Sequence, residues 1–230
     1  FVTASTNYEQ TLISESYQVD NQKIKQINPG VDYELFVPDQ SIDRENIFLS
    51  IGRIQQQKGQ LETLRFLNSF KEVETDFMCY FVGGPSGSSG DEYLSELKES
   101  VKELSLSSHV EFLGNLPQVD IRNLLNSAKL LIHTSQYETF GLVAIEANSM
   151  GVPVLTTNNG SMQEIITNKE NGYLVDGLDY QDVNISIKNL INDDQYFEQR
   201  MINCMNKSKD YKWENTVDGL LDLYQEAKFS

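Results

Sequence analysis

The chain has 230 residues, of which 39% are hydrophobic and 23% are charged, as expected for an ordinary folded protein able to bury a core. With 18 basic and 34 acidic residues, its formal net charge of −16 argues against nucleic acid or an anionic membrane as the main partner. No apolar run approaches the ~20 residues that a membrane-spanning helix needs. Cys79 and Cys204 form no CxxC and no metal-ligand pattern, which fits a reducing cytoplasm.

Short β-rich runs alternate with amphipathic helical stretches along the chain. The predicted strands are, in chain order, 1–4, 23–27, 47–51, 77–82, 110–113, 130–133, 152–156 and 172–175. Apolar residues at helical spacing predict one helix over 94–104 and another over 217–224. Ser5 can cap the helix after the first strand, and Pro117 can open the helix after the fifth. The alternation is typical of an α/β protein with a doubly wound, Rossmann-like parallel sheet covered on both faces.

Two cations follow the predicted strand 47–51. Ligands of a doubly wound sheet bind in the crevice beyond the carboxyl ends of the strands. Arg53 comes directly after this strand, and Lys58 with Gly59 is predicted to open the next helix. A lysine there opposes the helix macrodipole by ~0.3–1 kcal/mol, and a bound phosphate would reverse that local cost. Taken alone, however, the two residues are better explained as a solvated arginine and a lysine that serves solubility.

A second cluster contains two glutamates, Glu138 and Glu146, on either side of a predicted helix start. The helix begins near Phe140, Gly141 and Leu142, and its free N–H groups point at the crevice. Glu138 precedes the helix, whereas Glu146 lies inside it among apolar residues. We therefore expect the Glu146 carboxylate to be partly buried and to need hydrogen-bond donors. A lysine or backbone amides can supply these donors, and so can the two hydroxyls of a ribose.

Other candidate residues carry weaker signals. Gly84, Gly87 and Gly90 match neither a P-loop nor a dinucleotide-binding fingerprint and predict a flexible loop. His133 ends an apolar strand and can either face the crevice or be a satisfied core histidine. No cluster of His, Cys, Asp and Glu has metal-ligand spacing, so we expect no metal.

The segment 137–147, which carries Glu138-x7-Glu146, resembles the signature of glycosyltransferase family 4, retaining enzymes of GT-B fold. Three further segments resemble the same family and stand in the family's order along the chain: 29–38, 52–59 and 151–166. The turn at 82–87 resembles the branch that contains sucrose-phosphate synthases and mycothiol-pathway glycosyltransferases. The resemblance runs from about Phe1 to the helix 213–227, and it implies the C-terminal, donor-binding half of a GT-B enzyme.

The family implies a role for each matching residue. Arg53 and Lys58 would bind the diphosphate in place of a divalent metal, and the backbone amides of Phe140, Gly141 and Leu142 would contact the diphosphate and the sugar. Catalysis would then consist of stabilising the leaving group, so that no cofactor is expected beyond the nucleotide-sugar substrate.

The two carboxylates and the base site complete the implied set. Glu138 would contact hydroxyls of the donor sugar and position it rather than act as a base, while Glu146 would bind the ribose. The main chain around Leu116 would meet the base. Two positions depart from the family pattern, because Asn148 stands where Met is common and Ser161 replaces the second glycine of a Gly-Gly turn.

The resemblance also implies a domain organisation. Residues 1–40 would be a connecting segment with the first elements, 41–212 the donor-binding domain, and 213–230 a helix that packs back toward an N-terminal domain. Because the chain begins at Phe1 rather than Met, we expect a fragment that lacks the acceptor domain and is inactive alone. The parent protein would be cytoplasmic, or peripheral at a membrane through its other half.

The expected function is transfer of a sugar from an NDP-sugar, preferably a UDP-sugar, to an unidentified acceptor that is a glycan, a lipid, a protein or a small molecule. Two alternatives stay open. A non-catalytic, transferase-like binding or partner subunit is disfavoured by the complete set of Arg53, Lys58, Glu138 and Glu146. A GT-B nucleotide-sugar 2-epimerase is disfavoured by the residues around the two glutamates.

Overall fold

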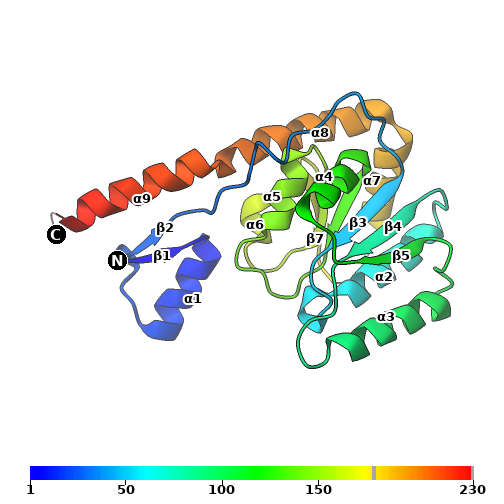
Figure 1. The fold of residues 1–230 in the computed structure, drawn as a ribbon, viewed down its shortest axis with the longest axis horizontal. Helices are drawn as coiled ribbons and strands as arrows, with labels where there is room; N and C mark the ends of the chain where they lie inside the picture. Colours follow the sequence, from blue (N-terminus) through cyan, green and yellow to red (C-terminus); the bar gives the residue numbers. More distant parts are fainter. Residues whose placement is uncertain (178–179, 229–230) are drawn as a thin grey trace.

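A six-stranded parallel sheet forms the main body of the computed structural model, which describes residues 1–177 and 180–228 (Figure 1). Its strands are β3 (Ile47–Ile51), β4 (Met78–Val82), β5 (Val110–Gly114), β6 (Leu130–His133), β7 (Val154–Thr157) and β8 (Gly172–Val175). Their order in the sheet is β5-β4-β3-β6-β7-β8. The direction of winding therefore changes between β3 and β6. The loops that follow these two strands enclose a crevice at this switch point.

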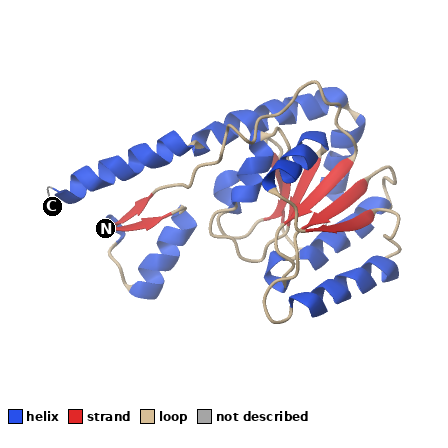
Figure 2. Ribbon diagram, in the orientation of Figure 1, coloured by secondary structure: helices blue, strands red, loops and turns tan. Residues whose placement is uncertain are grey.

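Helices cover both faces of the sheet, as Figure 2 shows. One face carries α2 (Gln60–Lys71), α3 (Gly90–Glu103) and α7 (Gln181–Asn192), and the other carries α4 (Gln118–Ser127), α5 (Leu142–Ser149) and α6 (Met162–Ile165). Successive strand residues point to opposite faces, so Phe48 enters the first of these cores and Leu49 the second. Helix α8 (Asp194–Ser208) packs against α5 and α7. The predicted doubly wound α/β fold is confirmed.

The first two strands do not join this sheet. β1 (Val2–Ala4) and β2 (Ile24–Gln26) pair in parallel with each other and are connected by α1 (Asn7–Tyr17) and a 3₁₀ turn, η1 (Asn21–Lys23). Figure 1 shows this small unit beside the long C-terminal helix, apart from the main sheet. Ser5 was the wrong choice of cap, because the helix begins one position later than expected. Thr6 is the N-cap, and its hydroxyl accepts a hydrogen bond from the N–H of Glu9.

The C-terminal helix α9 (Trp213–Lys228) follows a 3₁₀ turn, η3 (Lys209–Tyr211), and the last two positions of the predicted helix lie outside the described residues. Its apolar stripe is largely uncovered: Trp213 is 52% exposed, Val217 49%, Leu221 52% and Tyr224 66%. The predicted boundaries 1–40, 41–212 and 213–230 stay predictions. Among the helices that the structure describes, none has the length and hydrophobicity to cross a membrane.

Candidate functional site

The loop after β3 carries the two predicted cations. Arg53 is exposed, and its carbonyl accepts a hydrogen bond from the Gln60 side chain. The prediction that Lys58 opens a helix is wrong. Lys58 ends a 3₁₀ turn, η2 (Gln56–Lys58), and Gly59 after it is the N-cap of α2. Gly59 has a φ of +69°, and a Cβ there would lie 2.0 Å from the carbonyl oxygen of Thr134. Glycine therefore allows this loop to pack against the loop that follows β6.

That close packing brings Lys58 to Glu138. The Lys58 ammonium lies 2.9 Å from Oε2 of Glu138, and Nε2 of His133 lies 3.1 Å from the same oxygen. The three side chains are largely shielded, with exposed fractions of 22% for Lys58, 15% for Glu138 and 5% for His133.

The ionisation of Glu138 follows from these contacts. Burial acts to raise the pKa of Glu138, but the hydrogen bonds and charges of His133 and Lys58 outweigh it and lower this pKa to about 2. Glu138 is therefore a carboxylate at neutral pH, and Nε2 of His133 carries the proton and donates. His133 was a candidate from the sequence, but its contact with Glu138 was not predicted. A contact that depends on the path of a loop produces no recognisable spacing in the sequence.

The loop around Glu138 is fixed from a third element. Ser161, fully buried just before α6, has its hydroxyl 3.0 Å from the carbonyl oxygen of Glu138 and 3.1 Å from that of Phe140. Its N–H also donates to Glu138 O, at 3.3 Å. On the opposite side, the Thr6 hydroxyl donates to the carbonyl of Thr139. Ser161, noted in the sequence only as a departure from the family pattern, therefore supports the loop that carries Glu138.

The N-terminus of α5 opens toward these residues. Gly141 caps the helix with a φ of +94°, and a Cβ there would lie 2.8 Å from Sδ of Met162. In the described part of the chain, the N–H groups of Gly141, Leu142 and Val143 donate to no acceptor. Free N–H groups at a helix start carry a partial positive charge and favour anions.

Glu146 lies one turn further along α5. Burial raises the pKa of its carboxyl group. Among residues 1–177 and 180–228, no side chain or backbone N–H donates to this carboxylate. Of the donors considered from the sequence, the described part of the fold therefore supplies neither a lysine nor backbone amides.

These groups line one cleft of about 550 Å³ at the switch point. Its lining includes Arg53, Lys58, His133, Glu138, Phe140, Gly141, Leu142 and Glu146. Leu116, in the loop between β5 and α4, is half-buried and does not line this cleft. Its assignment to the base therefore stays a prediction. The described residues hold no group of three or more His, Cys, Asp and Glu side chains placed to bind a metal. That the reaction needs no metal stays a prediction as well.

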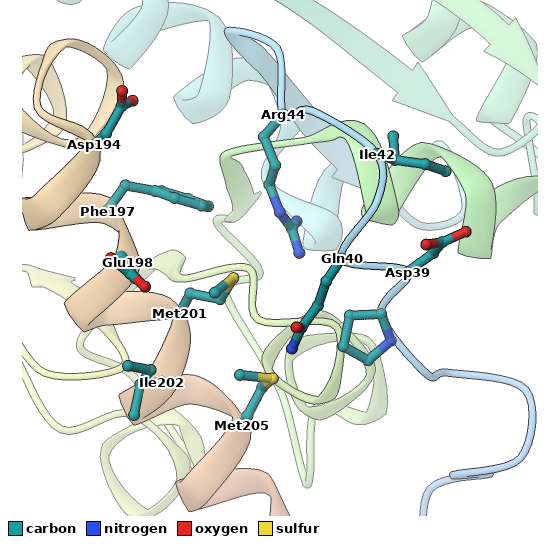
Figure 3. A pocket seen from close by; sticks show the side chains of 11 residues that line it. Asp39, Gln40, Ile42, Arg44, Asp194, Phe197, Glu198, Met201, Ile202 and Met205 are labelled. Atoms are coloured by element: carbon teal, nitrogen blue, oxygen red, sulfur yellow. The ribbon is translucent and has the colours of Figure 1, made fainter.

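A second hollow, of about 500 Å³, lies between the segment 38–44 and α8 (Figure 3). Its main cation, Arg44, donates hydrogen bonds to the carbonyls of Leu125, Ala128 and Met150 and lies over the ring of Phe197. Arg44 thus holds the segment 38–44 against the domain. None of the site residues predicted from the sequence lines this hollow.

Comparison with known sequences identifies the family. Residues 33–207 match the family model described as glycosyl transferases group 1. The chain belongs to this family. It is 32% identical over 235 residues to a D-inositol 3-phosphate glycosyltransferase of Corynebacterium urealyticum, an alignment that covers 96% of this chain and 55% of the relative. The chain thus spans about half the length of the curated relatives it matches.

Solved structures show the same fold. Over 99% of this chain and 62% of the other, the structure resembles Anabaena HepE in complex with UDP and glucose, with a TM-score of 0.84 and 22% identity. It also resembles sucrose-phosphate synthase from Thermosynechococcus elongatus over 98% of this chain and 58% of the other, with a TM-score of 0.83 and 24% identity. The predicted family and the Rossmann-like domain of a GT-B glycosyltransferase are confirmed, and sucrose-phosphate synthase is among the structures that match.

Proposed function

We propose that this chain is the donor-binding domain of a retaining, metal-independent glycosyltransferase that uses an NDP-sugar, preferably a UDP-sugar. One observation carries the proposal. The cleft at the switch point combines two cations, the free N–H groups of α5 and two shielded carboxylates. In a nucleotide-sugar, the diphosphate needs cations and N–H donors, and the hydroxyls of the ribose and the sugar need acceptors such as carboxylates.

The diphosphate is assigned to Arg53, Lys58 and the start of α5. The chain has a formal net charge of −16, so an anion must be held by local groups against an unfavourable overall field. When the bond between the anomeric carbon and the diphosphate oxygen breaks, the diphosphate keeps the electron pair. Preorganised donors stabilise the developing charge, each contributing on the order of 10²–10³ in rate. The acceptor hydroxyl then attacks on the same face, which retains the configuration, and passes its proton to the departing diphosphate oxygen.

The carboxylates are assigned to hydroxyl groups. Glu146, half-buried and without a donor among the described residues, matches the diol of the ribose. Glu138, ionised and shielded, matches hydroxyls of the donor sugar, which it positions rather than deprotonates.

The acceptor site is assigned to the remaining half of a longer protein, because the curated relatives are about twice the length of this chain. The uncovered stripe of α9 fits a helix that packs against that half. We place the protein in the cytoplasm, where the buried free thiols of Cys79 and Cys204 would stay reduced. Peripheral membrane association would involve the other half.

Titration with UDP, GDP and ADP, in the presence of a chelator and without divalent metal, tests this function. A ligand that binds only the folded state stabilises it by about 2.7 kcal/mol at a hundredfold excess over Kd. We expect UDP to raise the melting temperature and Lys58→Met to weaken the effect, with Lys98→Met on the exposed face of α3 as the charge-matched control. Failure of every nucleotide to bind, or equal binding by both variants, would contradict the proposal.

A further inference from the structure

The two oxygens of the Glu138 carboxylate have different surroundings. Oε2 receives both Lys58 Nζ, at 2.9 Å, and His133 Nε2, at 3.1 Å. Oε1 has no hydrogen-bond partner among the described residues, and Glu138 lines the cleft. One oxygen is therefore held by the protein, while the other can accept a hydrogen bond from a ligand hydroxyl.

The two partners of Oε2 would respond differently to a diphosphate. Lys58 has a long, flexible side chain on a turn, and a diphosphate at the start of α5 would compete with Glu138 for its ammonium group. His133 ends β6 in the interior of the sheet and is almost fully buried, so its ring cannot follow a ligand. Once Lys58 turns to the diphosphate, His133 is the contact that still fixes Oε2.

We propose that His133 is a positioning residue, which keeps the Glu138 carboxylate directed at the donor sugar while Lys58 binds the diphosphate. The inference rests on the proposed function and adds a residue to it. His133 acts through Glu138, to which its Nε2 donates. Its loss should therefore weaken the part of the affinity that comes from the sugar and leave the part that comes from UDP.

The test compares dissociation constants for UDP, UDP-glucose and UDP-N-acetylglucosamine in the wild type and in His133→Leu and His133→Gln. For the UDP-sugar that the wild type binds more tightly, we expect His133→Leu to weaken binding about tenfold, as for loss of a hydrogen bond to a charged group. UDP affinity should change far less, which also shows that the variant folds. His133→Gln, which can still donate to Oε2, should recover most of the loss.

Two further variants separate positioning from a structural role. His109→Gln, in the chain's other histidine, is the matched control, because that ring stacks on Phe77 away from the cleft. In a Glu138→Ala background, His133→Leu should cause no further loss for the UDP-sugar. Equal loss for UDP and the UDP-sugar, no loss for either, or full additivity with Glu138→Ala would overturn the inference. If the wild type binds no UDP at all, the proposed function itself fails.

Discussion

Lys58 Nζ lies 2.9 Å from Oε2 of Glu138, although the two residues are 80 positions apart in the sequence. This ion pair joins the loop after β3 to the loop after β6, across the switch point of the sheet. The group assigned to the diphosphate therefore touches the group assigned to the sugar. A substitution in either one changes the surroundings of the other, so single variants at these positions report on both parts of the donor.

Glu138 should make the stability of the fold depend on acid. Its pKa falls from 4.5 to about 2 on folding, so its contribution is complete above pH 4.5 and is lost as the pH falls toward 2. The shift corresponds to about 3 kcal/mol. Glu138→Gln should be less stable than the wild type at neutral pH, and the difference should shrink between about pH 5 and about pH 3. Urea denaturation at several pH values measures it, and a difference that does not change with pH would refute the prediction.

Glu146 should lower the stability of the fold at neutral pH while it strengthens the binding of UDP. Because burial raises its pKa, the ionised carboxylate costs stability at neutral pH, and this cost disappears as the pH falls and the group is protonated. Glu146→Gln should therefore melt at a higher temperature than the wild type, yet bind UDP about tenfold more weakly, through loss of charged hydrogen bonds to the ribose. Thermal melts with and without UDP decide this. A variant that is less stable and binds UDP normally would remove Glu146 from the site.

Ser161 should control the order of the loop that carries Glu138. Ser161→Ala removes the hydroxyl that lies near the carbonyls of Glu138 and Phe140 but keeps the volume close to that of serine. We expect faster hydrogen exchange at the amides of Ala144 and Ser161, which donate to carbonyls of this loop, and a loss of about 1 kcal/mol in stability. Ser186→Ala on α7, whose hydroxyl bonds within its own helix turn, is the control. Unchanged exchange at these two amides would show that the hydroxyl does not hold the loop.

Asn148 should stabilise the fold without serving the cleft. Its side-chain amide donates to the carbonyls of Val152 and Asn171, and its Oδ1 accepts from the Asn171 side chain, all of them buried. Asn148→Leu removes these three hydrogen bonds and leaves the Val152 carbonyl without a donor among the described residues, which should cost about 1–3 kcal/mol. UDP affinity should stay the same. Asn189→Leu on the exposed face of α7 is the matched control. Loss of UDP binding in a folded Asn148→Leu variant would contradict this separation.

The sequence predicted the strands of the main sheet well, because strands buried on both faces are continuous apolar runs with polar ends. The strands 47–51, 130–133 and 172–175 have the predicted bounds. The same runs place Arg53 and Glu138 at the carboxyl edge, where the structure brings them together with the start of α5.

Contacts between loops could not be predicted in this way. The pairing of β1 with β2 depends on a tertiary choice between two possible sheets, and both choices leave the same pattern in the sequence. The contact between His133 and Glu138 depends on the path of the loop between them, which Gly59 and Ser161 fix from other elements. The sequence also could not decide between Ser5 and Thr6 as the cap of α1, because both hydroxyls suit the position.

The most direct test of the donor site is to follow backbone amide shifts of this chain by NMR as UDP is added without divalent metal. We predict that the largest shifts fall on Gly141, Leu142 and Val143, whose N–H groups would gain a phosphate oxygen as acceptor, and on the loop from Arg53 to Lys58. Shifts centred on the hollow around Arg44 and Met201, or no shifts at saturating UDP, would contradict it.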